Sequence, residues 1–184
     1  IWNYWVNNYL LGNQPPAFDI LYWNADTTRL PARLHRDYID LYFTNPFVKS
    51  GKLTLNEKTI DMSKVKAESY VVAGVTDHIT PWKGVYKTAQ IMGEGTTFVL
   101  SNSGHLQSLL NPPTNPKASF TIGPINPAGP DAFLGEAGKR KGSWWLDWRD
   151  WLHARSGKEV VAPTSLGSAR HPVIASAPGT YVFD

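Results

Sequence analysis

The sequence predicts an α/β fold for the central part of the chain, because two buried strands are each followed by a polar loop and then by a helix. Residues 69–74 and 97–100 are short runs that are apolar on both faces, as strands of a buried parallel sheet are. Helical patterns follow at 83–92 and at about 106–110. Strands that alternate with helices in this order predict a parallel sheet with helices packed on it.

Upstream of this sheet, the pattern predicts two helices and a hairpin. Residues 1–12 and 30–43 carry apolar side chains at helical spacing. Residues 52–55 and 59–62 alternate between apolar and polar side chains around Asn56-Glu57, which is typical of a β-hairpin.

Downstream of the sheet, we expect a long irregular segment and then one more helix. Residues 111–142 are rich in Pro, Gly, Asn and Lys, which favours a surface excursion, with Lys139-Arg140-Lys141 as a solvated loop rather than a site for a polyanion. Residues 143–152 predict a helix with Ser143 as its N-cap. One face of this helix is apolar, and Trp145 lies off that face, where it can contact another part of the chain. The residues that share the apolar face are Trp144, Trp148, Trp151 and Leu152.

Composition excludes several classes of protein. The net charge of +3 is small and the basic residues are scattered, so no nucleic-acid partner is expected. No run approaches the roughly 18 apolar residues that span a bilayer, and no stretch shows a signal-peptide pattern. Cysteine is absent, which excludes a disulfide framework and a thiolate metal site within these 184 residues. We therefore expect a cytoplasmic protein that uses no metal. Most of the eight tryptophans are expected in the core.

Asp77 and His105 are the candidate catalytic residues. They are 28 residues apart, and each follows one of the two buried strands. Polar side chains at the carboxyl ends of parallel strands meet at one edge of the sheet, where α/β proteins hold their chemistry. An acid followed by a histidine on successive late strands is the order of a hydrolase-type triad, in which the carboxylate orients the imidazole and the imidazole takes the nucleophile's proton. Gly104 is expected to permit the tight turn that exposes the ring.

The other histidines are weaker candidates. His78 is adjacent to Asp77 and is interpreted as a residue that shapes the loop, not as the base. His35, His153 and His171 lie in polar or helical-surface contexts and are not expected to be catalytic. No Gly-x-Ser-x-Gly or Gly-x-Cys-x-Gly motif is present, so a nucleophile would have to lie upstream of this chain.

The chain resembles the polyhydroxyalkanoate synthases over nearly its whole length. The weakest stretches are residues 45–66 and 114–141. The matching motifs are Trp2-Asn3-Tyr4-Trp5-Val6-x-x-Tyr9-Leu10, Phe18-Asp19-Ile20-Leu21-Tyr22-Trp23-Asn24-x-Asp26-x-Thr28-x-Leu30-Pro31, Asp77-His78-Ile79-Thr80-Pro81-Trp82, Ser103-Gly104-His105, Asn111-Pro112-Pro113 and Gly142-Ser143-Trp144-Trp145-x-x-Trp148.

The resemblance implies the C-terminal portion of an α/β-hydrolase fold with part of a lid insertion. Residues 1–50 would belong to the lid and its return, 51–155 to the core with the Asp and His loops, and 156–184 to a C-terminal tail. The sequence starts at Ile1 inside an aromatic run, and we expect this point to be a cut within a longer protein. The chain alone is then expected to be inactive.

The family's activity implies substrates and partners. An upstream cysteine attacks a 3-hydroxyacyl-coenzyme A, releases coenzyme A and passes the acyl group to a growing polyester. By motif, Asp77 is the triad acid and His105 the triad base. Coenzyme A enters as part of the substrate, so no cofactor is expected. The resemblance also implies a location at polyester granules and a homodimer of the full-length enzyme.

Two alternatives stay open. One is another α/β-hydrolase, such as a polyester depolymerase or an esterase, with an upstream serine in place of the cysteine. The other is a granule-binding protein with a degenerate site, which would be expected to have lost Asp77 or His105.

Overall fold

A computed structural model describes residues 2–15, 23–49, 51–177 and 179–180 of the chain. The chain divides into two compact units, residues 1–65 and residues 66–184. Each is described by itself. In the part of the chain that the structure describes, no helix combines the length and the apolar character needed to cross a bilayer.

The first unit holds short helices and a two-stranded hairpin. The helical stretch near its start begins as an α-helix and continues as a π-helix, a widened form that usually occupies a single turn. The hairpin forms as predicted, but its second strand is shorter, because the Asp61 side chain accepts a hydrogen bond from the Ser63 N–H and starts a 3₁₀ turn. The elements are α1 (Trp2–Tyr4), η1 (Trp5–Leu10), α3 (Ala32–Thr44), η2 (Pro46–Val48), β1 (Leu53–Leu55), β2 (Lys58–Ile60) and η3 (Met62–Lys64).

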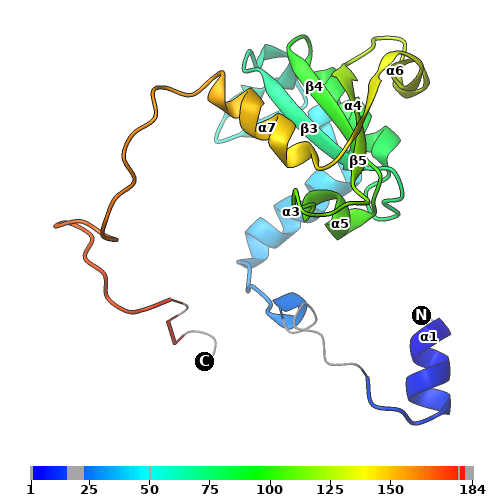
Figure 1. Cartoon of the computed structure of the whole chain (residues 1–184), viewed down its shortest axis with the longest axis vertical. Coiled ribbons are helices and arrows are strands. Elements are labelled where there is room, and N and C mark those ends of the chain that lie inside the picture. Colours follow the sequence, from blue (N-terminus) through cyan, green and yellow to red (C-terminus); the bar gives the residue numbers. More distant parts are fainter. Residues whose placement is uncertain (1, 16–22, 50, 178, 181–184) are drawn as a thin grey trace. The chain divides into compact units, whose positions relative to one another are not determined.

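The second unit is built on a four-stranded sheet in the order β3-β4-β5-β6 (Figure 1). Strands β3 and β4 are parallel, as the alternation of strands and helices predicts, whereas β5 and β6 add on in antiparallel fashion. The elements are β3 (Ser69–Gly74), α4 (Trp82–Met92), β4 (Thr96–Ser101), α5 (His105–Leu109), β5 (Ser119–Pro124), α6 (Pro130–Glu136), β6 (Gly138–Lys141) and α7 (Trp144–His153). Residues 156–177 and 179–180 form no helix or strand.

The prediction of an irregular surface excursion over residues 111–142 is wrong. This segment supplies β5, α6 and β6, and Lys139-Arg140-Lys141 is the edge strand of the sheet rather than a loop. Its Gly, Pro and Asn residues mark the boundaries of short elements. Asn126 begins a turn that Gly129 closes at φ 111°, and Pro130 then starts α6. Lysines on an edge strand oppose pairing with other chains.

The side chains of the sheet alternate between two apolar clusters. Phe98 and Leu100 point to one face, where they pack with α4 and α6, and Val99 points to the other, where it packs with Phe120 and with Trp144 of α7. The helices thus cover both faces of the sheet, which explains why β4 carries three apolar residues in succession, Phe98, Val99 and Leu100.

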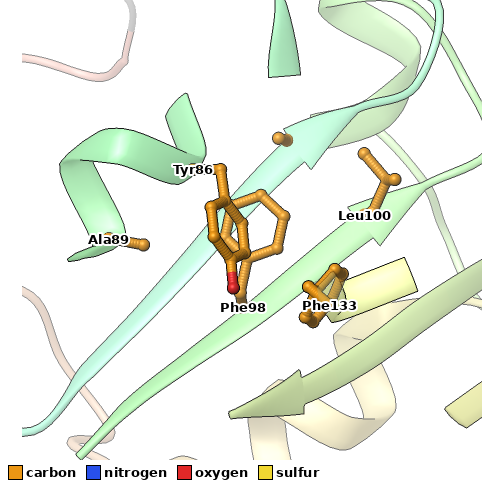
Figure 2. Packing of buried hydrophobic residues seen from close by; sticks show 6 residues of the cluster. Tyr86, Ala89, Phe98, Leu100 and Phe133 are labelled. Atoms are coloured by element: carbon orange, nitrogen blue, oxygen red, sulfur yellow. The ribbon is translucent and has the colours of Figure 1, made fainter. Parts of the chain in front are cut away.

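Tyr86 of α4 lies at the centre of the first cluster (Figure 2). Its ring is fully buried and contacts Phe98 and Phe133 at centroid distances of 4.8 and 5.3 Å. Its hydroxyl accepts a hydrogen bond from the Asn126 N–H at 2.6 Å, so the buried polar atom is satisfied. α4 is therefore tied to the turn before α6 as well as to the sheet.

Phe133 gives the first test of this core, because its position was predicted to be irregular and exposed. Its side chain is 1% exposed, whereas Leu134 beside it is 40% exposed. Phe133→Ala should lower the free energy of unfolding by about 3–5 kcal/mol, and Leu134→Ala by less than about 1 kcal/mol. Urea unfolding followed by tryptophan fluorescence measures both. Equal, small effects would mean that α6 is not part of the core.

Candidate active site

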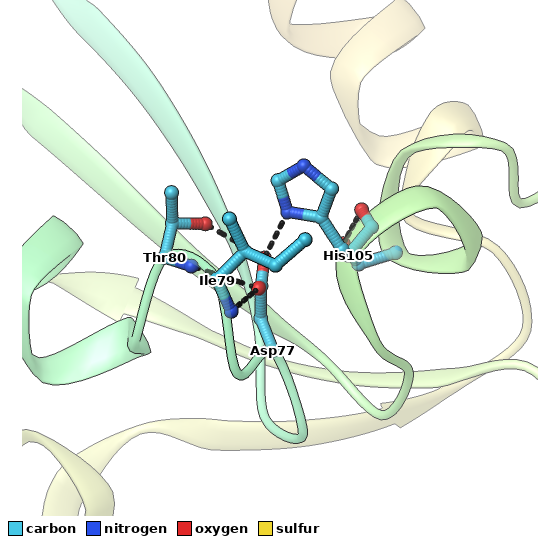
Figure 3. Close-up of polar contacts among 5 residues, drawn as sticks. Asp77, Ile79, Thr80 and His105 are labelled. Atoms are coloured by element: carbon cyan, nitrogen blue, oxygen red, sulfur yellow. Dashed lines mark hydrogen bonds and ion pairs between the residues drawn. The ribbon is translucent and has the colours of Figure 1, made fainter. Parts of the chain in front are cut away.

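The loops that follow β3 and β4 lie side by side and bring Asp77 and His105 together. Beyond the strands, the Thr76 N–H donates to the Ser103 carbonyl, which extends the parallel pairing into the loops. Asp77 lies in the first loop, and His105 is the first residue of α5 after the second. The Asp77 Oδ2 to His105 Nδ1 distance is 2.8 Å (Figure 3), so the pair that the sequence singled out is in hydrogen-bond contact.

The Asp77 carboxylate accepts four hydrogen bonds. Oδ1 accepts from the backbone N–H groups of Ile79 and Thr80, both at 2.9 Å. Oδ2 accepts from the Thr80 hydroxyl at 2.7 Å and from His105 Nδ1. The side chain is only 5% exposed. The loop therefore fixes the carboxylate in one orientation before it meets the imidazole.

These contacts determine the protonation state of Asp77. Desolvation of the carboxyl pushes its pKa upward, but the hydrogen bonds from Thr80, His105 and Ile79 favour the carboxylate and together outweigh desolvation. The pKa of Asp77 is consequently held well below its usual range, and the group is a carboxylate at neutral pH. A carboxylate can accept only from an Nδ1–H, so this contact selects the tautomer with the proton on Nδ1.

The second ring nitrogen of His105 is free to act on a reactant. Nε2 lies on the side of the ring away from Asp77 (Figure 3), and it makes no hydrogen bond to any residue that the structure describes. The His105 side chain is 38% exposed. With Nδ1 protonated and bonded to Asp77, Nε2 carries the lone pair of a general base.

Gly74, at the end of β3, permits the close approach of the two loops. A Cβ at Gly74 would lie 2.6 Å from the Ser103 carbonyl oxygen and 3.0 Å from Ser108 Cβ, which no packed structure tolerates without a shift. The requirement predicted for Gly104 is wrong. Its φ of −86° and ψ of −167° are extended backbone that any residue adopts, and a Cβ there would meet Thr76 Oγ1 at an ordinary 3.5 Å.

The remaining histidines do not join the site. His78 is exposed, and its ring makes no hydrogen bond within the described ranges, so the loop is shaped by Ile79 and Thr80 instead. His35, His153 and His171 are exposed. Among residues 2–15, 23–49, 51–177 and 179–180, no group of three His, Cys, Asp or Glu side chains could hold a metal ion.

Comparison with known proteins agrees with this architecture. A family model described as the alpha/beta hydrolase fold matches residues 1–112, which is more than half of the chain. The chain belongs to the alpha/beta hydrolase fold family. In that family the acid of the triad precedes the histidine along the chain. Asp77 and His105 occur in the same order here, after β3 and β4 respectively.

The alpha/beta hydrolase chain is also similar over its whole length to polymerases of poly(3-hydroxyalkanoate). It is 52% identical to poly(3-hydroxyalkanoate) polymerase 2 of Ectopseudomonas oleovorans over 183 residues, and 51% identical to polymerase 1 of that organism over 184 residues. These matches cover 100% of the chain and 33% of each polymerase. The polymerase subunit PhaC of Cupriavidus necator is 38% identical, over 99% of the chain and 31% of the subunit. The chain thus spans about a third of the length of the curated relatives it matches.

Two residues of this alpha/beta hydrolase site were missed by sequence reasoning. The spacing of Thr80 relative to Asp77 is typical of an Asx-type turn, in which an aspartate accepts from backbone N–H groups two and three residues ahead, and this signal could have identified it. Gly74 had no such signal, because the clash that requires glycine comes from Ser103 and Ser108, which are distant in the sequence.

The lowered pKa of Asp77 predicts how stability depends on pH. A carboxyl whose pKa in the folded state lies below its unfolded value of about 3.9 stabilises the fold above that pH, and this stabilisation is lost as the pH falls toward the folded value. Asp77→Asn should therefore be less stable than the parent chain near neutral pH, and the difference should shrink as the pH falls below about 4. Thr80→Val removes one donor, so its deficit should be smaller and follow the same trend. Urea unfolding across this pH range measures the free energy of unfolding of both variants and of the parent chain. A deficit that does not change with pH would contradict a lowered pKa of Asp77.

Proposed function

We propose that the chain is the part of a poly(3-hydroxyalkanoate) polymerase that carries the acid and the base of a Cys-Asp-His triad. The observation that carries the proposal is the 2.8 Å contact between Asp77 and His105, which leaves Nε2 of the imidazole free. Similarity to polymerases over the whole chain supports the choice of reaction. The chain contains no cysteine, so the nucleophile would come from a segment outside these 184 residues.

The first step would transfer an acyl group from a thioester to the cysteine. His105 Nε2 takes the thiol proton, and the thiolate attacks the carbonyl carbon of a 3-hydroxyacyl-coenzyme A. The tetrahedral intermediate then breaks its bond to the coenzyme A sulfur, which leaves with the proton that the imidazolium returns. The Asp77 carboxylate stabilises the imidazolium between these two transfers.

In the second step, a 3-hydroxyl oxygen would attack the carbonyl carbon of the acyl-cysteine, form the ester bond and break the bond to the cysteine sulfur. This step requires a base that takes the hydroxyl proton and returns it to the departing cysteine thiolate. Asp77 is poorly suited to this task, because its two oxygens already accept four hydrogen bonds and its lowered pKa makes it a weak base. His105 is partly exposed and has a free Nε2. We therefore assign the role of base in both steps to His105, with Asp77 restricted to orienting and stabilising the ring.

The wider setting of the reaction rests on the family resemblance alone. The proposed polymerase acts in the cytoplasm at the surface of polyester granules, as a homodimer, and takes coenzyme A only as part of its substrate.

Substitutions in the complete polymerase, with the nucleophile segment present, test these roles. His105→Ala should lower coenzyme A release by about 10³-fold or more, because the cysteine loses its base. Asp77→Asn should lower single-turnover coenzyme A release and steady-state polymer formation by similar factors, since one base serves both steps. His78→Ala is the matched control and should stay close to the parent rate, because its ring is exposed and is not among the described donors to the Asp77 carboxylate.

The outcomes separate the alternatives. A selective loss of polymer formation in Asp77→Asn would show that Asp77 itself activates the 3-hydroxyl. A His78 variant as inactive as the His105 variant, with its fold intact, would mean that His78 is the base and that the assignment to His105 is wrong. Hydrolysis of esters without polymer formation would favour a hydrolase with an upstream serine.

A further inference from the structure

The motif Ser143-Trp144-Trp145 has no role in the chemistry proposed above, yet all three of its side chains donate to the backbone of the His105 segment. The Trp144 Nε1–H donates to the Ser108 carbonyl at 2.7 Å, and the Trp145 Nε1–H donates to the Leu109 carbonyl at 2.9 Å. The Ser143 hydroxyl donates to the Asn111 carbonyl. We call Ser143, Trp144 and Trp145 the donor triplet.

Two of these acceptors, the Ser108 and Leu109 carbonyls, belong to the last two residues of α5, and the Asn111 carbonyl lies just beyond the helix. The Leu109 carbonyl also accepts from the Asn111 N–H at 3.0 Å. α5 is a single short helix that begins at His105 and ends at Leu109, and the last carbonyls of a helix have no partner within it. Helices of this length are unstable in isolation, so their geometry is set by tertiary contacts. The donor triplet supplies such contacts at the C-terminal end of α5, whereas the imidazole of His105 lies at its N-terminal end.

The donor triplet is itself held by contacts with α7 and with the sheet. Ser143 caps α7 by accepting from the Trp145 N–H, and Trp144, which is 7% exposed, packs against Val99 and Phe120 of the sheet. Further along α7, Asp147 accepts from the Tyr70 hydroxyl of β3 at 3.0 Å. Burial raises the pKa of Tyr70, and the contact with Asp147 raises it further, so the phenol remains a donor.

The other side of α5 is equally constrained. Ser108 lies against Gly74, where a Cβ would approach Ser108 Cβ to 3.0 Å, and the Ser108 hydroxyl donates to the His105 carbonyl. α5 is thus enclosed between the end of β3 and the start of α7. A shift of the Ser108 or Leu109 carbonyl changes the angle of α5, and with it the direction of the imidazole at its first residue.

We propose that Trp144 and Trp145 are positioning residues for His105, which act through their indole N–H groups on α5. This inference rests on the proposed role of His105 as general base. Loss of the Trp144 donor removes the indole bond to the Ser108 carbonyl, and loss of the Trp145 donor leaves the Leu109 carbonyl with the Asn111 N–H alone. Either loss lets α5 tilt, which moves Nε2 away from the cysteine. Displacements on the scale of 1 Å at a reacting group lower rates by about 100-fold.

The test replaces the donor without changing the ring. In the complete polymerase, Trp145 is replaced by benzothienylalanine, which has sulfur in place of the indole N–H, and separately by phenylalanine (Trp145→Phe). Trp144→Phe probes the more buried partner. The same two replacements at Trp148 are the matched control, since Trp148 lies on the same helix, contacts Trp144 at a ring distance of 6.0 Å and makes no carbonyl contact among the described residues.

The readouts are kcat and KM for coenzyme A release, and the rate at which iodoacetamide alkylates the nucleophilic cysteine near neutral pH. We expect replacements at 145 and 144 to lower kcat and the alkylation rate by about 10- to 100-fold, with KM within about twofold of the parent. The Trp148 replacements should leave all three values at the parent level. Far-UV circular dichroism identifies a variant that has lost its fold. In that case the benzothienylalanine protein, which keeps the bicyclic ring and lacks only the N–H donor, decides whether the indole donor positions His105.

His105→Ala is included so that the two proposals can fail separately. If His105→Ala is inactive and the benzothienylalanine protein matches the parent, the positioning role is wrong and the base assignment stands. If phenylalanine lowers the rate and benzothienylalanine does not, the indoles act by packing, which also overturns the inference. If His105→Ala retains the parent rate, the proposed function fails, and the positioning role fails with it.

Discussion

The hydrogen bond between Asp77 and His105 forms only if the loops after the parallel strands β3 and β4 lie side by side. Much of the packing in the second unit holds these two loops together. The loops are joined through the Thr76 N–H and the Ser103 carbonyl. Gly74 lets them approach, because any larger residue would meet Ser103 and Ser108. The strands that carry them are buried on both faces by α4, α6 and α7. The packing of helices on both faces of the sheet therefore helps to set the distance between Asp77 Oδ2 and His105 Nδ1.

Asp77 shows how a loop can hold a carboxylate in one orientation and keep it charged at neutral pH. Its four hydrogen bonds satisfy both oxygens and keep the pKa low despite the small exposure of the side chain. A carboxylate held in this way is a good partner for an imidazolium and a poor acceptor of further protons. The same geometry thus suits the orienting role proposed for Asp77 and makes the carboxylate unsuitable as a base.

Sequence reasoning identified the parts that depend on local pattern and failed where distant contacts decide. The parallel strands, the helices α4 and α7 and the contact between Asp77 and His105 follow from apolar runs and from the order of polar loops. Residues 111–142 were misread, because short elements separated by Asn, Gly and Pro have the composition of a loop. Trp145 was expected to contact another part of the chain, but its acceptor on Leu109 could not be read from spacing. The glycine requirement was placed at Gly104 and belongs to Gly74, because only the fold shows which backbone atoms approach.

We infer that Asp77 holds His105 with its proton on Nδ1 and its lone pair on Nε2. Long-range ¹H–¹⁵N correlation spectra of protein labelled with ¹⁵N-histidine distinguish the two nitrogens of each ring directly, and His105→Ala assigns the signals. We expect the neutral ring of His105 to carry its proton on Nδ1 and the Asp77→Asn substitution to disturb this preference. A neutral His105 ring with its proton on Nε2 would overturn the proposed role of the pair, because that tautomer has no N–H to donate to the carboxylate and no lone pair on Nε2 to accept a proton from a nucleophile.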